Sequence, residues 1–152
     1  MNDLNKIKNY CAKREVCIFE AKNKLFSWGI DEQEANNLIK LLLKEKFIDE
    51  KRYSVAYVND HYKIKKWGKN KIKSALISKK INSNTIHKAI EKIDEKIYAQ
   101  NLITILENKA VTIKSQNSTT TSKEKDKLIR HAMSKGYEFD FILTCLTSIK
   151  HT

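Results

Sequence analysis

Residues 30–42 read IDEQEANNLIKLL, and their apolar spacing recurs in INSNTIHKAIEKI at 81–93 and in YEFDFILTCLTSI at 137–149. Within each stretch, the residues 5, 8, 9 and 12 positions after the first lie on one face of a helix. All of them are apolar: Ala35, Leu38, Ile39, Leu42, Ile86, Ala89, Ile90, Ile93, Ile142, Cys145, Leu146 and Ile149. At an apolar content of 41%, chance would give twelve such positions about 2 times in 100,000. The chain is therefore predicted to be a tandem helical repeat.

Helices are the regular element that the composition favours. The chain has no proline and only three glycines, so it offers few of the residues that hairpin turns need. Gly29, Lys80 and Gly136 precede the three stretches, where they suit a helix end and a tight turn. The predicted fold class is all-α, with three tandem three-helix repeats that form an elongated, curved helical array of the right-handed type.

Three repeats account for the whole chain, at residues 1–47, 48–93 and 94–152. The polar run KSQNSTTTS at 114–122 is predicted to be a loop that interrupts the third repeat. Thr121, with a glutamate three residues later, is predicted to cap the helix that follows this loop.

Most aromatic residues are predicted to lie in the core. The helix predicted over residues 49–66 has one apolar face, formed by Tyr53, Ala56, Tyr57 and Ile64. Phe26 and Trp28, near the end of an earlier helix, are expected to lie in the core or in contacts between repeats. Arg52 is expected to be solvated.

The chain is expected to be a soluble, cytoplasmic monomer. Residues 1–10 contain no apolar run of the kind found in signal peptides. No stretch of the sequence approaches the roughly 20 apolar residues of a membrane span. Cys11, Cys17 and Cys145 have no disulfide or zinc spacing, so their thiols are expected to be packed or unused.

A thirty-residue block carries most of the positive charge. Residues 61–90 contain nine lysines and no acidic residue, which gives +9 of the formal net charge of +12. A block of this kind attracts polyanions. Trp67 lies within it and could stack on a base or bury its ring under the turn, and both interpretations stay open. The candidate binding residues are Lys63, Lys65, Lys66, Trp67, Lys69, Lys71, Lys73, Lys79 and Lys80.

No set of residues suggests catalysis. The four histidines are scattered, none of them pairs with a cysteine or histidine at metal-ligand spacing, and there is no glycine-rich phosphate loop. Asp49, Glu50 and Asp60 are interpreted as capping or solvated groups. The chain is therefore predicted to be non-enzymatic, with no cofactor and no metal.

Residues 47–81 read FIDEKRYSVAYVNDHYKIKKWGKNKIKSALISKKI. An apolar-Asp-Glu run is followed by Arg-Tyr, by Ala-Tyr-Val and by a glycine that opens a basic helix. This pattern resembles the signature of the RecX family, bacterial regulators of the recombinase RecA. Arg14-Glu15-Val16 and the segment IRHAMSKGYEFDFI resemble the family's opening and closing blocks. The residues that match the signature are Asp49, Arg52, Tyr53, Ala56, Gly68 and Leu76.

The resemblance implies a curved array of three-helix units that binds in the groove of the RecA–single-stranded DNA filament. It also implies modulation, mostly inhibition, of recombinase, ATPase and coprotease activity, and so a role in DNA repair, recombination and the SOS response. The family commonly has Gly-Pro where this chain has Gly68-Lys69. Proline in a first helical turn is favourable but replaceable, so the expected fold is unchanged.

Two other functions stay open. The chain could be a plain nucleic-acid-binding helical module that contacts single-stranded or double-stranded DNA without a recombinase partner. It could also be an adaptor that binds only protein. A steep dependence of binding on salt concentration would separate the first of these from the second.

Overall fold

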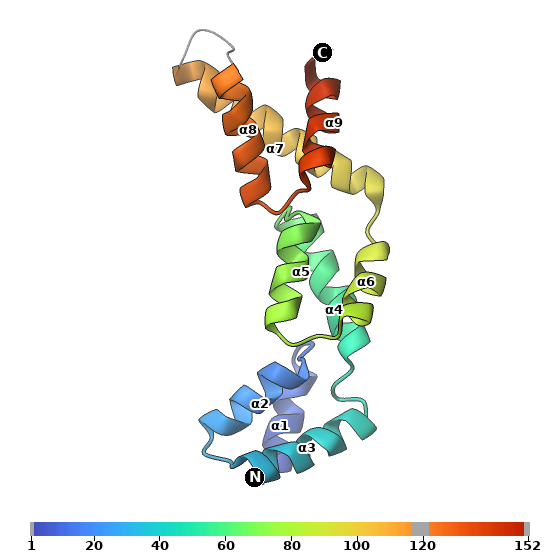
Figure 1. Cartoon of the computed structure of the whole chain (residues 1–152). Helices are drawn as coiled ribbons and strands as arrows, with labels where there is room; N and C mark the ends of the chain where they lie inside the picture. Colours follow the sequence, from blue (N-terminus) through green and yellow to red (C-terminus); the bar gives the residue numbers. More distant parts are fainter. Residues whose placement is uncertain (1, 117–121, 151–152) are drawn as a thin grey trace. The chain divides into compact units, whose positions relative to one another are not determined.

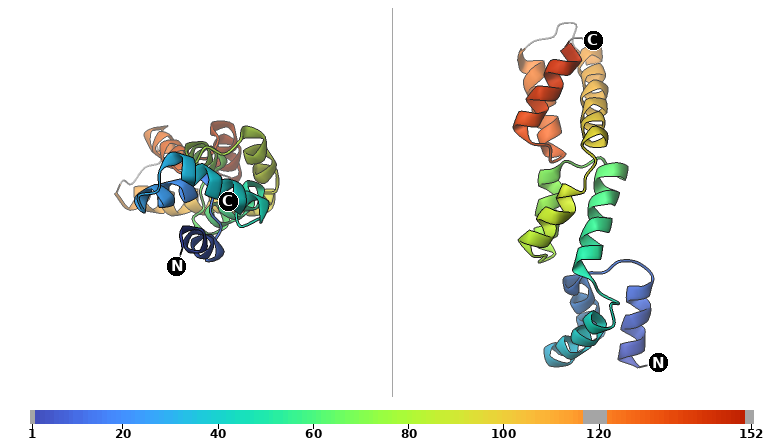
Figure 2. Two further views of the ribbon diagram at one scale, coloured as in Figure 1. Left: turned by 90° about the horizontal axis from the view of Figure 1, so that it is seen from below. Right: turned by 90° about the vertical axis from the view of Figure 1, so that its right-hand side faces the viewer.

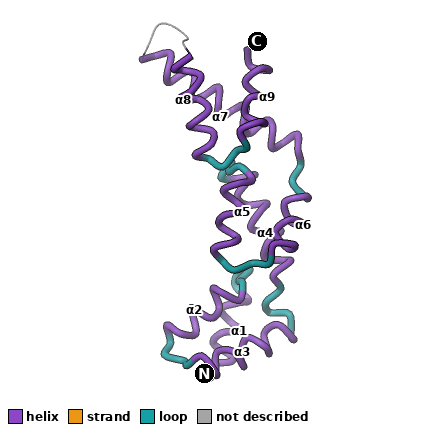
Figure 3. The backbone as a smooth tube through the Cα atoms, in the orientation of Figure 1, coloured by secondary structure: helices purple, strands orange, loops and turns teal. Residues whose placement is uncertain are grey.

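The computed structural model describes residues 2–116 and 122–150, and every regular element in these residues is a helix (Figure 3). This confirms the predicted all-α class. The helices labelled in Figure 1 are α1 (Asp3–Ala12), α2 (Ile18–Ser27), α3 (Glu32–Lys44), α4 (Glu50–Asn59), α5 (Lys69–Ser78), α6 (Ser83–Glu91), α7 (Glu95–Gln116), α8 (Ser122–Ser134) and α9 (Phe139–Lys150). A π-helical turn, η1 (Asp60–Ile64), follows α4 directly.

Contacts divide the chain into two compact units. The first unit comprises Met1–Tyr57 and Leu76–Glu91, and the second comprises Val58–Ala75 and Lys92–Thr152. In the second unit, α7 packs against both α8 and α9 (Figure 2). The repeat boundaries predicted after Phe47 and Ile93 stay predictions.

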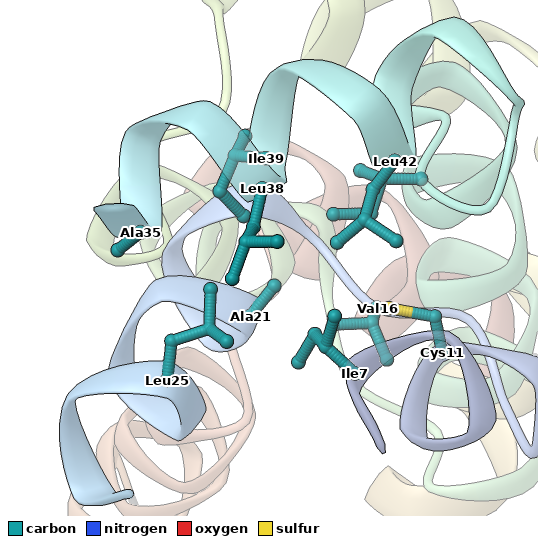
Figure 4. Packing of buried hydrophobic residues seen from close by; sticks show 10 residues of the cluster. Ile7, Cys11, Val16, Ala21, Leu25, Ala35, Leu38, Ile39 and Leu42 are labelled. Carbon is teal, nitrogen blue, oxygen red and sulfur yellow. The ribbon is translucent and has the colours of Figure 1, made fainter. Parts of the chain in front are cut away.

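One core cluster of the first unit comes mainly from helices α1 to α3, with Val16 and Ile48 from the segments between helices. Figure 4 shows its buried side chains, which are Ile7, Cys11, Val16, Ala21, Leu25, Ala35, Leu38, Ile39 and Leu42. The side chain of Asp31 caps α3, because its Oδ1 accepts the Glu34 N–H at 2.8 Å. Spacing of three and four residues along α3 therefore gives this helix its buried face.

All twelve template positions are buried except Ile149, which is half-buried. The turn before each template is also the same. Gly29, Lys80 and Gly136 have φ values of 80°, 61° and 98°, in the left-handed region. In each case the next residue donates its N–H to a carbonyl five residues back: Ile30 to Leu25, Ile81 to Leu76 and Tyr137 to Ala132, all at 3.2 Å. These bonds are those of a Schellman helix end.

We expect Ile90→Ala to lower the free energy of unfolding by about 2–5 kcal/mol, because truncating a buried isoleucine leaves a cavity. The Ile90 side chain is 7% exposed. Urea denaturation followed by circular dichroism measures the change. Ile77→Ala is the matched control, since Ile77 is 63% exposed and should lose no more than about 0.5 kcal/mol. Equal losses in the two variants would contradict the burial of the template face.

One predicted helix face is wrong at its C-terminal end. Tyr53 is buried and Tyr57 half-buried, but Ile64 is 76% exposed. The buried residues beyond them are Val58 and Tyr62. The reason is the π-helical turn η1, which holds more residues than an α-helical turn and so rotates the positions within it away from the α-helical face.

The ends of the predicted 114–122 loop are helical. Helix α7 continues through Gln116, and α8 begins at Ser122. Residues 117–121, and with them the predicted cap at Thr121, lie outside the described residues. Across 2–116 and 122–150, no helix combines the length and the apolar character that crossing a membrane requires.

Candidate nucleic-acid interface

Trp67 lies at the centre of a cluster of cationic and aromatic side chains. Its half-buried ring contacts the His61 ring, with 4.5 Å between centroids. The Nζ atoms of Lys71 and Lys65 lie 4.4 Å and 5.6 Å from a Trp67 ring centroid, within cation–π range. We call His61, Lys65, Trp67 and Lys71 the Trp67 cluster. The Trp67 ring is thus partly covered by side chains of its own protein and partly exposed. This lies between the two interpretations that the sequence left open, a ring free to stack on a base and a ring buried under the turn.

The backbone between η1 and α5 forms this cluster. Lys66 has a left-handed φ of 58°, and the Trp67 N–H donates to the His61 carbonyl at 2.9 Å. The Lys66 carbonyl accepts the hydroxyl hydrogen of Tyr137 at 2.8 Å. This turn reverses the chain between η1 and α5, so Lys65 and Lys71 reach the same ring.

The start of α5 is held against the α8–α9 turn. The Gly68 N–H donates to the Lys135 carbonyl at 2.7 Å, and the Asn70 N–H donates to the Gly136 carbonyl at 2.9 Å. A Cβ placed on Gly68 would lie 2.1 Å from the Gly136 carbonyl carbon. Glycine at position 68 therefore permits a backbone-to-backbone contact, which is a stronger requirement than opening a helix.

Lys69 differs from the other lysines of residues 58–75 because its charge is balanced by a carboxylate. Its Nζ pairs with Glu95 at 2.7 Å and lies 4.8 Å from the Tyr98 ring centroid. The Lys69 N–H donates to the Tyr98 hydroxyl at 2.8 Å, and that hydroxyl donates to Glu138. Burial, together with the hydrogen bond to Glu138, raises the pKa of Tyr98 well above its usual range. Lys69 thus fixes the start of α5 to α7.

The remaining lysines among the candidate binding residues fall into two groups. Among the described residues, no ion pair involves Lys63, Lys65, Lys66, Lys71 or Lys73, all of which belong to the second unit. Lys79 and Lys80 belong to the first unit, so the nine predicted binding residues do not lie in one unit.

Lys79 and Lys80 line a groove beside α2. Lys79 Nζ pairs with Glu20 at 3.1 Å. The groove has a volume of about 320 Å³ and is lined by Ile18, Phe19, Lys22, Asn23, Phe26, Glu50, Lys79 and Lys80. Phe26 is 42% exposed, so of its two predicted places the core is wrong. It lines this groove together with Lys79 and Lys80, which belong to the next predicted repeat. Trp28 is half-buried and packs against the core of the first unit.

The signature residues around α4 are structural. Asp49 Oδ1 accepts the N–H groups of Lys51 and Arg52 at 3.0 Å and 3.1 Å and so caps α4. Arg52 Nε lies 2.8 Å and 2.7 Å from the two Glu15 carboxylate oxygens, and an Nη donates to the Lys46 carbonyl at 3.2 Å. Arg52 is exposed, as expected, and its guanidinium also pairs with Glu15. Glu15 precedes it by 37 residues, a separation that no helical spacing reveals.

The other signature residues differ in burial. Tyr53 and Leu76 are buried, and Ala56 is half-buried.

Burial raises the pKa of both Cys11 and Cys17 to about 11, so these thiols stay protonated at neutral pH. In the residues described, no three histidine, cysteine or acidic side chains are grouped as a metal site would need.

Comparison with known proteins gives consistent matches. The family model described as RecX, second three-helix domain, matches residues 49–90. The chain is 31% identical to Regulatory protein RecX of Clostridium botulinum (strain Alaska E43 / Type E3) over 123 aligned residues. This alignment covers 81% of this chain and 57% of that relative. The chain is 30% identical over 145 residues to Regulatory protein RecX of Clostridium tetani, with 95% and 63% covered. The chain thus spans less than two thirds of the length of these curated relatives.

Solved structures share the fold. A crystal structure of RecX from Lactobacillus salivarius matches with a TM-score of 0.85 at 23% identity, over 98% of this chain and 95% of that one. A second crystal structure, of regulatory protein RecX, matches with a TM-score of 0.84 at 15% identity, over 95% of this chain and 70% of the other. These structures support an all-α helical repeat. From the sequence matches together with this shared fold, we conclude that the chain belongs to the RecX family of regulatory proteins.

Proposed function

We propose that the chain is a non-enzymatic regulator that binds the RecA–single-stranded DNA filament and mostly inhibits its recombinase, ATPase and coprotease activities. It would thereby regulate DNA repair and recombination in the cytoplasm, as a monomer and without a cofactor. Family membership supports the regulatory role. The observation that carries the proposed partner is the Trp67 cluster, together with neighbouring lysines whose charge no carboxylate balances within the described residues.

The chemistry of this surface suits a nucleoprotein. Lysine side chains release counterions when they neutralise phosphates, which supplies affinity without regard to sequence. A partly exposed tryptophan offers a face or edge on which an unstacked base can lie. We assign the contact to Lys63, Lys65, Lys66, Trp67, Lys71 and Lys73, with Lys79 and Lys80 as further cations and Lys69 in a positioning role.

Regulation of this kind needs no catalytic residue. A filament exists in states of different activity, and a protein that binds one state more tightly shifts the population toward it. The free energy available is the difference in affinity between the states, which a charged contact surface can supply.

We expect the protein to bind preassembled RecA–single-stranded DNA filaments at concentrations well below those that coat the same DNA alone. Contact with protein and DNA at once raises the effective affinity. Co-sedimentation measures binding, and ATP hydrolysis measures inhibition. Excess free single strand should leave most of the inhibition in place. Full relief by excess strand, or filament binding no tighter than binding to bare DNA, would contradict the proposal.

A second candidate function is a plain single-stranded nucleic-acid-binding module. The same Trp67 cluster favours it, because stacking and phosphate neutralisation require no recombinase. Under this alternative, inhibition appears only when DNA is limiting, so the competition experiment above distinguishes the two.

A further inference from the structure

A second group of cations lies in a cleft between α7 and α8, away from the Trp67 cluster. The cleft has a volume of about 460 Å³ and is lined by Lys109, Thr112, Ile113, Lys127, Arg130 and His131. We call it the α7–α8 cleft. Lys109 lies eleven residues beyond Tyr98 on α7, which is about 16 Å along the helix axis. The cleft is therefore a separate site from the Lys69–Tyr98 contact.

The sequence builds this cleft from two matching stripes. Lys109, Thr112 and Ile113 occupy positions i, i+3 and i+4 of α7. Lys127, Arg130 and His131 occupy the same three positions of a stripe on α8. Residues at this spacing share one face of a helix, and α7 and α8 pack against each other (Figure 2).

The charges in the cleft are all of one sign. Its lining contains two lysines and one arginine but no carboxylate. Within the described residues, no ion pair involves Lys109, Lys127 or Arg130. Arg130 Nε donates to the Asp126 carbonyl at 3.5 Å, a weak contact within its own helix. Like charges brought together without a counter-charge are relieved when an anion binds.

Burial and the positive charges around the cleft both affect the pKa of His131. Burial lowers its pKa, and the charges of Lys109 on α7 and of Lys135 after α8 lower it further. The imidazole is half-buried at the edge of the cleft, so it is placed to sense an anion there.

We propose that the α7–α8 cleft binds phosphate groups, and that the backbone of a nucleic-acid strand supplies them. The guanidinium of Arg130 presents a planar fork that matches phosphate oxygens, and lysines add point charge. Phosphate is favoured over a carboxylate because a strand presents successive phosphates, so more than one of the three permanent cations can pair with a phosphate of its own. Only the nucleic-acid source of the phosphate rests on the proposed function. The chain would then hold a strand at two places, the Trp67 cluster and this cleft.

The first test is direct binding to the full chain. Inorganic pyrophosphate and a short oligothymidylate are each titrated while the His131 imidazole resonances are followed by NMR. We expect both probes to shift the His131 resonances. A shift with pyrophosphate alone would keep the phosphate site and overturn its nucleic-acid source. No shift with either probe would overturn the site.

The second test uses two matched variants of α8. Lys127→Gln/Arg130→Gln removes two charges from the cleft, and Lys123→Gln/Lys125→Gln removes two exposed charges of the same helix that do not line it. The cleft variant should lower the slope of log K against log salt for single-stranded DNA by about 1.4, at roughly 0.7 for each lost phosphate contact. Equal slopes in the two variants would overturn the proposal.

The two proposals fail in different ways. If the wild-type chain does not prefer filaments over bare DNA, the proposed regulator function fails. The salt slopes of the two variants on bare oligonucleotide still test the cleft in that case. If the cleft variant behaves like its control but filaments are still bound and inhibited, only the cleft fails.

Discussion

Gly68→Ala should lower the free energy of unfolding by about 3 kcal/mol, the upper part of the usual range for overpacked sites. The added Cβ would lie 2.1 Å from the Gly136 carbonyl carbon and 2.2 Å from the Tyr137 nitrogen. Both are backbone atoms, so no side-chain rotation can relieve the clash. The two chain segments must move apart, and the bonds from Gly68 to Lys135 and from Asn70 to Gly136 are then lost.

Gly29→Ala is the control for this change. Gly29 has a φ of 80°, but an added Cβ would meet nothing within 4 Å. It therefore measures the cost of left-handed backbone alone, about 1–2 kcal/mol. Chemical denaturation of the two variants gives the comparison. A loss for Gly68→Ala no larger than that for Gly29→Ala would show that the segments are not in contact.

The second large effect is expected from Lys65→Glu/Lys71→Glu. Both lysines lie on the Trp67 ring and neither belongs to an ion pair among the described residues. Losing two phosphate contacts should lower the affinity for single-stranded DNA roughly 50-fold near 50 mM salt and reduce the salt slope by about 1.4. Fluorescence anisotropy at several salt concentrations measures both quantities.

Lys123→Glu/Lys125→Glu carries the same change in net charge on exposed positions of α8. It should lose far less affinity, because only general attraction falls. Circular dichroism checks that both variants keep their helices. Equal losses in the two variants would reassign the Trp67 cluster to a solvated surface. Lys69 is left unchanged, since its pair with Glu95 contributes to the fold.

Local features were predictable from the sequence and nonlocal ones were not. The template faces and the turns at Gly29, Lys80 and Gly136 depend on residues within one or two helical turns, and the structure confirms them. The pairs of Arg52 with Glu15 and of Lys69 with Glu95 join residues far apart in sequence, where no periodicity applies.

The errors in the helix predictions have a similar cause. The π-helical turn at Asp60–Ile64 left no mark in the apolar spacing, so Ile64 was placed on the wrong face. The polar residues at the end of α7 were predicted to be a loop because their helix propensity is low. Propensity is only a weak preference, and a helix that is already packed can continue through such residues. The α7–α8 cleft was missed because its two stripes lie on helices separated by the low-complexity run.

The contact between Gly68 and Gly136 limits how modular this repeat protein can be. In arrays of repeats, each unit commonly contacts only its neighbours, so a unit can be removed or exchanged without changing the surface of the others. Here the turn that carries Trp67 and the start of α5 donate to the Lys135 and Gly136 carbonyls, and the Lys66 carbonyl accepts from the Tyr137 hydroxyl. These partners lie 66 to 71 residues later in the sequence. A nascent or shortened chain that lacks this later segment would hold all the lysines of the basic block but not the geometry that aims Lys65 and Lys71 at one ring. We therefore expect the Trp67 cluster to assemble only when the α8–α9 turn is in place.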